Sequence, residues 1–140
     1  LTFVAGATVM SSMPPMTLPE VAFCGRSNVG KSSIINALTL STTARSSDKP
    51  GMTQQFNFYV LPRRLMMVDM PGYGFAFANE QKMAGWKVLI DQYIQTRKMK
   101  RVFLIIDGRH GVKQNDKDFM QRLDDARVSF QIILTKCDLV

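Results

Sequence analysis

The stretch from Gly25 to Ser32, GRSNVGKS, constrains this chain more than any other part of it. It matches the pattern G-x-x-x-x-G-K-[ST] at every fixed position, and this pattern is typical of a loop that binds phosphate groups. An ordinary glycine-rich turn is the alternative. The flanking residues argue against it, because an apolar run (residues 21–24) precedes the loop and apolar residues at helical spacing (residues 33–38) follow it. Strand, loop and helix in this order predict a nucleoside triphosphate site.

The residue types in this loop suit phosphate binding. Backbone N–H groups and the positive end of the following helix can converge on one anion. Gly25 and Gly30 allow a close approach that a Cβ would block. Lys31 can reach the β- and γ-phosphates, and the hydroxyl of Ser32 can coordinate Mg²⁺. We therefore expect the nucleotide to contact Gly25, Arg26, Ser27, Asn28, Val29, Gly30, Lys31, Ser32 and Ser33.

Length and composition suit a single globular domain with a basic surface. The chain has 140 residues, of which 46% are hydrophobic, and no apolar run approaches the length needed to cross a bilayer. A net charge of +7 favours a polyanionic partner such as RNA, although a solvated basic face is the alternative. Cys24 and Cys137 are expected about 10 Å apart, too far for a disulfide, so we expect a reducing compartment. The first residue is Leu1, not Met, which suggests an upstream segment.

Strand and helix patterns alternate after the phosphate loop. We interpret residues 1–18, which prolines interrupt, as an extension lying on the domain, and residues 19–140 as the domain itself. The short connection at residues 62–64 suits an antiparallel hairpin, and Trp86 is expected in the core. The fold class is therefore α/β, a three-layer sandwich with a mostly parallel sheet and one antiparallel strand. We expect strands at 20–24, 55–61, 65–68, 102–106 and 130–135, and helices at 31–40, 81–97 and 115–126.

Polar motifs follow several of these strands, at the edge where parallel sheets bind ligands. Asp69 ends an apolar strand, as expected of an acidic Mg²⁺ partner, and Gly72 can offer its N–H to the γ-phosphate. An Asp-x-Pro-Gly turn is a weak signal alone, but it is strong downstream of a phosphate loop. Thr53 lies in the polar loop of residues 41–53. Its hydroxyl can complete the Mg²⁺ shell, and this loop would become ordered with a triphosphate.

A further motif, Thr135-Lys136-Cys137-Asp138, follows the last expected strand. The Asp138 carboxylate can accept hydrogen bonds from the N1–H and 2-amino groups of guanine, and adenine has neither donor at those positions. A polar exit from a strand is the alternative for this motif alone. Together with the two preceding motifs it predicts guanine recognition.

Taken together, these residues resemble the EngB-type (YihA/YsxC) GTPases of the Era-like group. The resemblance covers nearly all of residues 19–138, and the motifs outside the phosphate loop are the more specific ones. The matching stretches are residues 19–23, 25–33, 49–54, 57–58, 68–74 and 134–138, with Asp107, Arg109 and His110.

The resemblance implies a P-loop NTPase fold of the Ras-like G-domain type, with GTP or GDP and Mg²⁺ as ligands. It also implies slow hydrolysis of GTP, with Lys31, Thr53 and Gly72 as catalytic candidates. The implied partner is the large ribosomal subunit or its rRNA, in ribosome assembly and cell division, with no DNA or membrane partner and a monomeric state favoured. The implied location is the cytoplasm of a bacterium, or a mitochondrion or plastid, without secretion. The implied ligands of phosphate, metal and base are Gly30, Lys31, Ser32, Thr53, Asp69, Gly72, Lys136 and Asp138.

The chain departs from the family pattern at its C-terminal end. The family continues beyond the last motif with a further helix, strand, base-contacting loop and terminal helix, whereas this sequence stops at Val140. We therefore expect the last strand to be an exposed apolar edge of an incomplete domain. Tyr73 stands where the Ras-type template has a glutamine that orients water, so we expect slow hydrolysis aided by an ion or partner. Asn28 is a candidate K⁺ ligand, because related Era-like GTPases use an asparagine there.

Two alternatives stay open. The chain can be a nucleotide-gated module that binds RNA or protein, with incidental hydrolysis. An ATP-using kinase or transport ATPase is disfavoured by Asp138. For an RNA partner, the expected phosphate contacts are Arg63, Arg64, Arg97, Lys98, Lys100 and Arg101.

Overall fold

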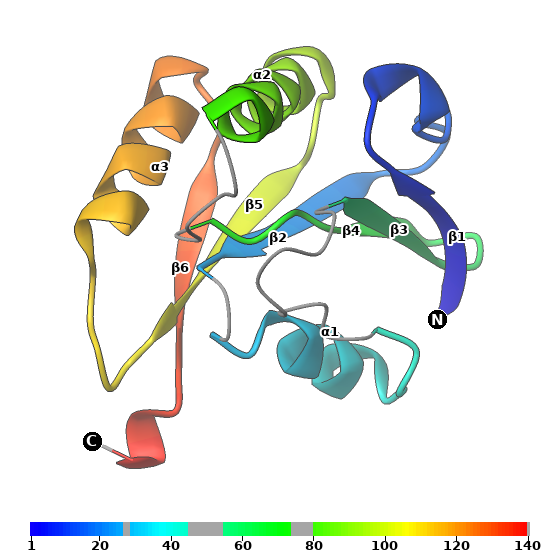
Figure 1. Ribbon diagram of the computed structural model, residues 1–140. Helices are drawn as coiled ribbons and strands as arrows, with labels where there is room; N and C mark the ends of the chain where they lie inside the picture. The colour runs from blue at the N-terminus through cyan, green and yellow to red at the C-terminus, as the bar shows by residue number, and fades with distance from the viewer. Residues whose placement is uncertain (27–28, 45–54, 74–79, 140) are drawn as a thin grey trace.

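The structure is a computed structural model that describes residues 1–26, 29–44, 55–73 and 80–139 (Figure 1). The strands are β1 (Thr2–Ala7), β2 (Glu20–Gly25), β3 (Phe56–Leu61), β4 (Leu65–Asp69), β5 (Arg101–Asp107) and β6 (Phe130–Thr135). The helices are α1 (Lys31–Thr39), α2 (Glu80–Thr96) and α3 (Gln114–Asp125), with short 3-10 turns η1 (Met10–Ser12) and η2 (Cys137–Leu139). The helices and strands expected after residue 19 are all present, with bounds that shift by one residue at most.

The strands form one sheet in the order β1-β3-β4-β2-β5-β6. Strand β3 is antiparallel to both of its neighbours, and the β2–β4, β2–β5 and β5–β6 pairs are parallel. Helices α2 and α3 cover one face of this sheet and α1 covers the other (Figure 1). The predicted three-layer α/β fold with one antiparallel strand is therefore confirmed.

Strand β2 is buried on both faces. Ala22 and Cys24 belong to the core cluster beneath α2 and α3, whereas Phe23 packs on the opposite face with Ile35 of α1. Side chains of a strand alternate between its faces, so a central strand covered on both sides reads as a continuous apolar run. This burial fixes the end of β2, and with it the position of the phosphate loop.

Residues 1–18, interpreted from the sequence as an extension lying on the domain, contain strand β1, which is part of the sheet. It is an edge strand of the sheet, with Thr2 opposite Val60 and Ala7 opposite Phe56. The register shifts between Phe3 and Ala5, and such an irregularity interrupts the alternation that would reveal a strand in the sequence. At the opposite edge, Ile132 and Leu134 of β6 are 38% and 57% exposed, which is the exposed apolar edge that we expected.

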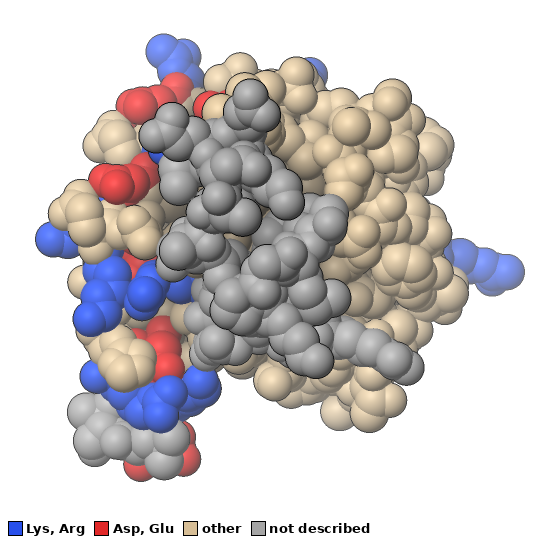
Figure 2. All heavy atoms as spheres, in the orientation of Figure 1, with Lys and Arg blue, Asp and Glu red and all other residues tan. Residues whose placement is uncertain are grey.

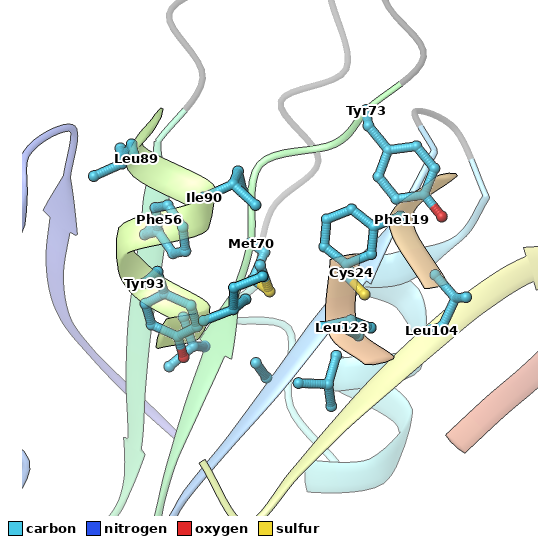
Figure 3. Packing of buried hydrophobic residues seen from close by; sticks show 14 of the residues in the cluster. Cys24, Phe56, Met70, Tyr73, Leu89, Ile90, Tyr93, Leu104, Phe119 and Leu123 are labelled. Atoms are coloured by element: carbon cyan, nitrogen blue, oxygen red, sulfur yellow. The ribbon is translucent and has the colours of Figure 1, made fainter. Parts of the chain in front are cut away.

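Helix α2 buries Ile90, Tyr93 and Ile94 on one face (Figure 3), and Trp86 packs against the same core, as expected. No helix in the described part of the chain is long and apolar enough to cross a membrane. Cys24 is buried and Cys137 exposed, and neither forms a disulfide.

One buried charge network lies at the amino end of the parallel strands. Glu20 is fully buried and accepts hydrogen bonds from the Tyr93 hydroxyl at 2.8 Å and from Arg97 at 2.6 and 2.9 Å. Arg97 also donates to the carbonyl of Pro14 at 2.9 Å, and its guanidinium lies 5.1 Å from the centre of the Phe58 ring. The expectation that Arg97 contacts RNA phosphate is wrong in this structure, because its side chain is only 11% exposed and already paired.

Candidate nucleotide-binding site

The phosphate loop connects the end of β2 to the start of α1, as predicted. A Cβ on Gly25 would lie 2.7 Å from the backbone oxygen of Ile105, so only glycine fits beside β5. Gly30 has a φ of 95° and precedes α1, whose N-terminus has no side-chain cap. The backbone N–H groups of an uncapped first helical turn are free of intrahelical partners and suit an anion. The local geometry therefore fits a phosphate group.

Lys31 and Asp69 meet at the carboxyl ends of neighbouring strands. The Nζ atom of Lys31 lies 2.5 Å from Oδ1 of Asp69, and the two side chains are 14% and 6% exposed. Lys31 begins α1 after the loop that follows β2, and Asp69 ends β4, which pairs with β2. The pairing confirms that the sheet brings the phosphate loop and the Asp-x-Pro-Gly motif to one place.

The oxygen ligands offered by Ser32 and Asp69 suit Mg²⁺. Ser32 is half-buried in the first turn of α1, and Ser33 is exposed. Among the described residues no three acidic, histidine or cysteine side chains form a metal-binding group. Mg²⁺ is usually held by one or two carboxylates together with substrate phosphates and water, so a hydroxyl and one carboxylate fit this ion. Of the other expected ligands, Ser27, Asn28 and Thr53 lie outside the described residues.

Thr135 contacts the phosphate loop itself. Its side-chain hydroxyl donates to the carbonyl of Val29 at 2.8 Å, and the residue is 9% exposed. The end of β6 is thereby fixed to the loop at the end of β2. The hydroxyl contacts the loop backbone, and a direct contact of Thr135 with nucleotide stays a prediction.

Lys136, one of the residues expected to bind the nucleobase, lies beside the last residue of β5. Asp138 is exposed in η2, and Lys136 has a φ of 57° with its Nζ 3.5 Å from Oδ2 of Asp107. Arg109 donates to Asp107 through Nε at 3.1 Å and Nη2 at 2.8 Å. These bonds, with a smaller contribution from Lys136, hold the pKa of Asp107 well below its usual range. Asp107 is thus an anchor that keeps the Lys136 side chain near the sheet.

Tyr73 is buried, and its side chain points into the core under α3. Its hydroxyl donates to Oδ1 of Asp116 at 2.7 Å, and its ring stacks on Phe119 (Figure 3). Burial raises the pKa of Tyr73, so the hydroxyl stays a donor at neutral pH. The expectation that Tyr73 cannot take the role of a water-orienting glutamine agrees with this orientation. Gly72, just before it, is also buried.

Asp116 and the Thr135–Val29 contact are the features that the sequence reasoning missed. A signal for Asp116 existed, because Lys113 and Asp116 have the spacing of a helix-capping pair. The backbone N–H of Lys113 donates to Oδ2 of Asp116 at 2.8 Å. Nothing in the sequence indicated that the same carboxyl group also binds Tyr73.

Comparison with known proteins agrees with this geometry. Residues 20–136 match the family model described as "50S ribosome-binding GTPase". The chain is 50% identical over 97% of its length to a "Probable GTP-binding protein EngB" of Rhodospirillum rubrum, and 51% identical over 99% to the protein of the same description from Gluconobacter oxydans. It spans 62% of the length of each of these two relatives.

Solved structures show the same fold. A crystal structure of a probable GTP-binding protein engB has a TM-score of 0.69 and 26% identity, covering 86% of this chain and 72% of that one. Aquifex aeolicus Era bound to GDP and AlF4⁻ has a TM-score of 0.65 and 21% identity, covering 88% and 42% of the two chains. The sequence motifs, the site and these matches lead to one conclusion: the chain belongs to the 50S ribosome-binding GTPase family and is similar to its EngB members.

Proposed function

We propose that this chain is the nucleotide-binding part of a GTP-hydrolysing switch. The observation that carries the proposal is the Lys31–Asp69 pair beside a phosphate loop in which Gly25 has no room for a Cβ and Gly30 has a φ of 95°. A cation and a carboxylate at the carboxyl ends of adjacent strands are the groups that bind the phosphates and Mg²⁺ of a nucleotide.

The roles of the described residues follow from their places. Lys31 would bind the β- and γ-phosphates, and Ser32 and Asp69 would hold Mg²⁺, which supplies charge neutralisation when bound. Tyr73 does not orient water, because its hydroxyl is engaged with Asp116. Hydrolysis by this chain alone is therefore slow, and an ion or a partner supplies the missing stabilisation of charge.

Guanine selectivity is the most direct test. Asp138 is exposed and follows β6, at the carboxyl edge of the sheet. Asp138→Asn replaces one acceptor by a donor, so preference should move from GTP toward xanthosine triphosphate, with GTP affinity lower by about 3 kcal/mol. Competition of each unlabelled nucleotide, ATP included, against labelled GTP measures this shift. Unchanged GTP preference in the variant contradicts the assignment of Asp138.

For the partner, we propose the large ribosomal subunit or its precursor, supported by the family description and by exposed basic residues. Arg63 and Arg64 lie in the β3–β4 turn, and Lys98, Lys100 and Arg101 lie before and at the start of β5. Because Glu20 and Val21 of β2 lie opposite Met66 and Arg101, these basic segments share the amino edge of the sheet. Exposed Arg127 in the α3–β6 connection joins them.

The side of the molecule around β1 is less suited to RNA. Residues 1–19 contain no charged side chain. Figure 2 accordingly shows an almost uncharged side around β1, while Lys and Arg mix with Asp and Glu on the side of α3. We therefore assign RNA contact to the amino edge of the sheet and not to the β1 side.

Cosedimentation with purified large subunits across a salt series tests this surface. Replacing Lys98, Lys100 and Arg101 by serine should reduce the slope of log affinity against log salt by about 0.9 for each phosphate that the variant no longer neutralises. Replacing Lys87 and Lys117, exposed on α2 and α3, by serine removes basic charge elsewhere on the surface and should leave the slope unchanged. Equal slopes in both variants contradict the assignment of RNA contact to the amino edge of the sheet.

The dependence of subunit binding on the bound nucleotide separates a switch from a passive module. A non-hydrolysable GTP analogue should support tighter subunit binding than GDP, by about 1–3 kcal/mol if the coupling is typical. Turnover that rises with added subunits supports the hydrolysing switch. Binding that depends on nucleotide without such a rise supports the alternative, a nucleotide-gated module with incidental hydrolysis.

A further inference from the structure

Tyr73 joins three parts of the site. Its backbone N–H donates to the carbonyl of Gly25 at 3.2 Å, and it forms an isolated parallel bridge with Arg26. Its side-chain hydroxyl binds Asp116 in the first turn of α3. The residue is thus fixed to the phosphate loop by its backbone and to α3 by its hydroxyl. Gly72, the expected γ-phosphate contact, is the residue directly before it.

Asp116 is the other half of this link, and it is only 1% exposed. One carboxyl oxygen accepts from the Tyr73 hydroxyl and the other accepts from the backbone N–H of Lys113. A buried carboxyl group that loses a donor is costly, so the position of Tyr73 and the first turn of α3 depend on each other. A shift of Gly72 toward a γ-phosphate therefore acts on α3 through this group.

We propose that Tyr73 is a positioning residue whose bond to Asp116 sets the place of Gly72, and with it the preference of the site for triphosphate over diphosphate. This inference rests on the proposed binding of guanine nucleotides. Phe119 supports it, since the stacked rings, with centroids 5.0 Å apart, hold the Tyr73 side chain in one orientation. The link also makes the start of α3 sensitive to the nucleotide.

The chain contains a matched control for this role. Tyr93 is also buried, its ring packs against that of Phe56 at a tilted angle, and its hydroxyl donates to the buried carboxylate of Glu20 at 2.8 Å. It lies at the amino end of the sheet, away from the phosphate loop, because Glu20 begins β2 whereas the loop follows its end. Tyr73→Phe and Tyr93→Phe therefore remove the same atom from similar surroundings.

The test compares the affinities of a non-hydrolysable GTP analogue and of GDP, both with Mg²⁺, for the whole chain and its variants. In Tyr73→Phe the ratio of the two affinities should fall by about fivefold or more, the lower end of typical coupling between sites. In Tyr93→Phe the ratio should stay unchanged, although the variant loses stability. Asp116→Asn should lower the ratio as well, and combining it with Tyr73→Phe should add little because both changes break one link.

Two outcomes overturn the inference. One is an equal ratio in Tyr73→Phe, Tyr93→Phe and the unchanged protein, and the other is full additivity of the Tyr73 and Asp116 changes. If the variants fail to fold, hydrogen exchange of the unchanged protein tests the link instead. Residues 113–117 should be better protected with the GTP analogue than with GDP. Equal protection in the two states contradicts the link. Failure of the unchanged protein to bind either nucleotide would instead refute the proposed function.

Discussion

Removing the Arg97 side chain should destabilise the protein strongly without affecting RNA binding. In Arg97→Ala, Glu20 remains fully buried but loses both of its bonds to the guanidinium. Breaking one partner of a buried ion pair costs about 3–5 kcal/mol. The carbonyl of Pro14 and the ring of Phe58 also lose the guanidinium as a partner, whereas the bond from Tyr93 remains. We expect a net loss near 4 kcal/mol, roughly the middle of that range.

Such a loss is large against the stability of a single domain, which is about 5–15 kcal/mol. Urea unfolding followed by circular dichroism measures it, and the midpoint of thermal unfolding should fall by about 10–15 °C. Lys98→Ala is the matched control, because Lys98 is the neighbouring residue and is exposed, so its effect should stay within about 0.5 kcal/mol. The salt dependence of RNA binding should respond to the loss of Lys98, Lys100 and Arg101 but not to Arg97→Ala.

A loss of stability under about 1 kcal/mol in Arg97→Ala would refute this reasoning, since it lies below the cost of even one buried charged hydrogen bond. A second variant separates charge from packing. Replacing Glu20 and Arg97 together by Gln and Met leaves no unpaired buried charge, so the double variant should be more stable than Arg97→Ala. A double variant less stable than Arg97→Ala would show that the packing of the guanidinium on Phe58, not the ion pair, dominates.

Three further predictions concern other parts of the molecule. Thr135→Val removes the hydroxyl that binds the Val29 carbonyl, so nucleotide affinity should fall by about 1–2 kcal/mol in equilibrium titrations, and unchanged affinity would show that the loop holds its shape alone. Burial raises the pKa of Tyr73 and of Tyr93, so both stay protonated while the protein is folded. Stability should therefore decrease as pH rises above about 10, where the unfolded chain releases these protons, and phenolate absorbance should rise only with unfolding. Turnover should be faster in K⁺ than in Na⁺ at equal ionic strength if Asn28 binds a cation, and equal rates would remove that role.

Much of the nucleotide site was predictable because its residues act through local chain geometry. The phosphate loop needs glycines at fixed positions and a helix that follows at once, and both requirements can be read along the sequence. Apolar runs likewise predicted β2 and β5, because strands covered on both faces carry no alternation to misread. An apolar run also predicted β6, although this strand is an edge with exposed apolar residues. The meeting of Lys31 and Asp69 followed from these elements, since parallel strands of one sheet end at the same edge.

Other roles were decided only by the tertiary structure. Arg97 and Glu20 are 77 residues apart, Tyr73 and Asp116 are 43 apart, and Thr135 and Val29 are 106 apart. No local pattern distinguishes an arginine paired in the core from one free to bind RNA, so Arg97 was assigned with its exposed neighbours. Strand β1 was missed for a related reason, because its pairing with β3 and an irregular register, not its own alternation, make it a strand. The sequence by itself determined the local motifs and the order of strands and helices along the chain. Packing of distant residues determined which polar side chains are buried and paired, because that depends on which surfaces the sheet brings together.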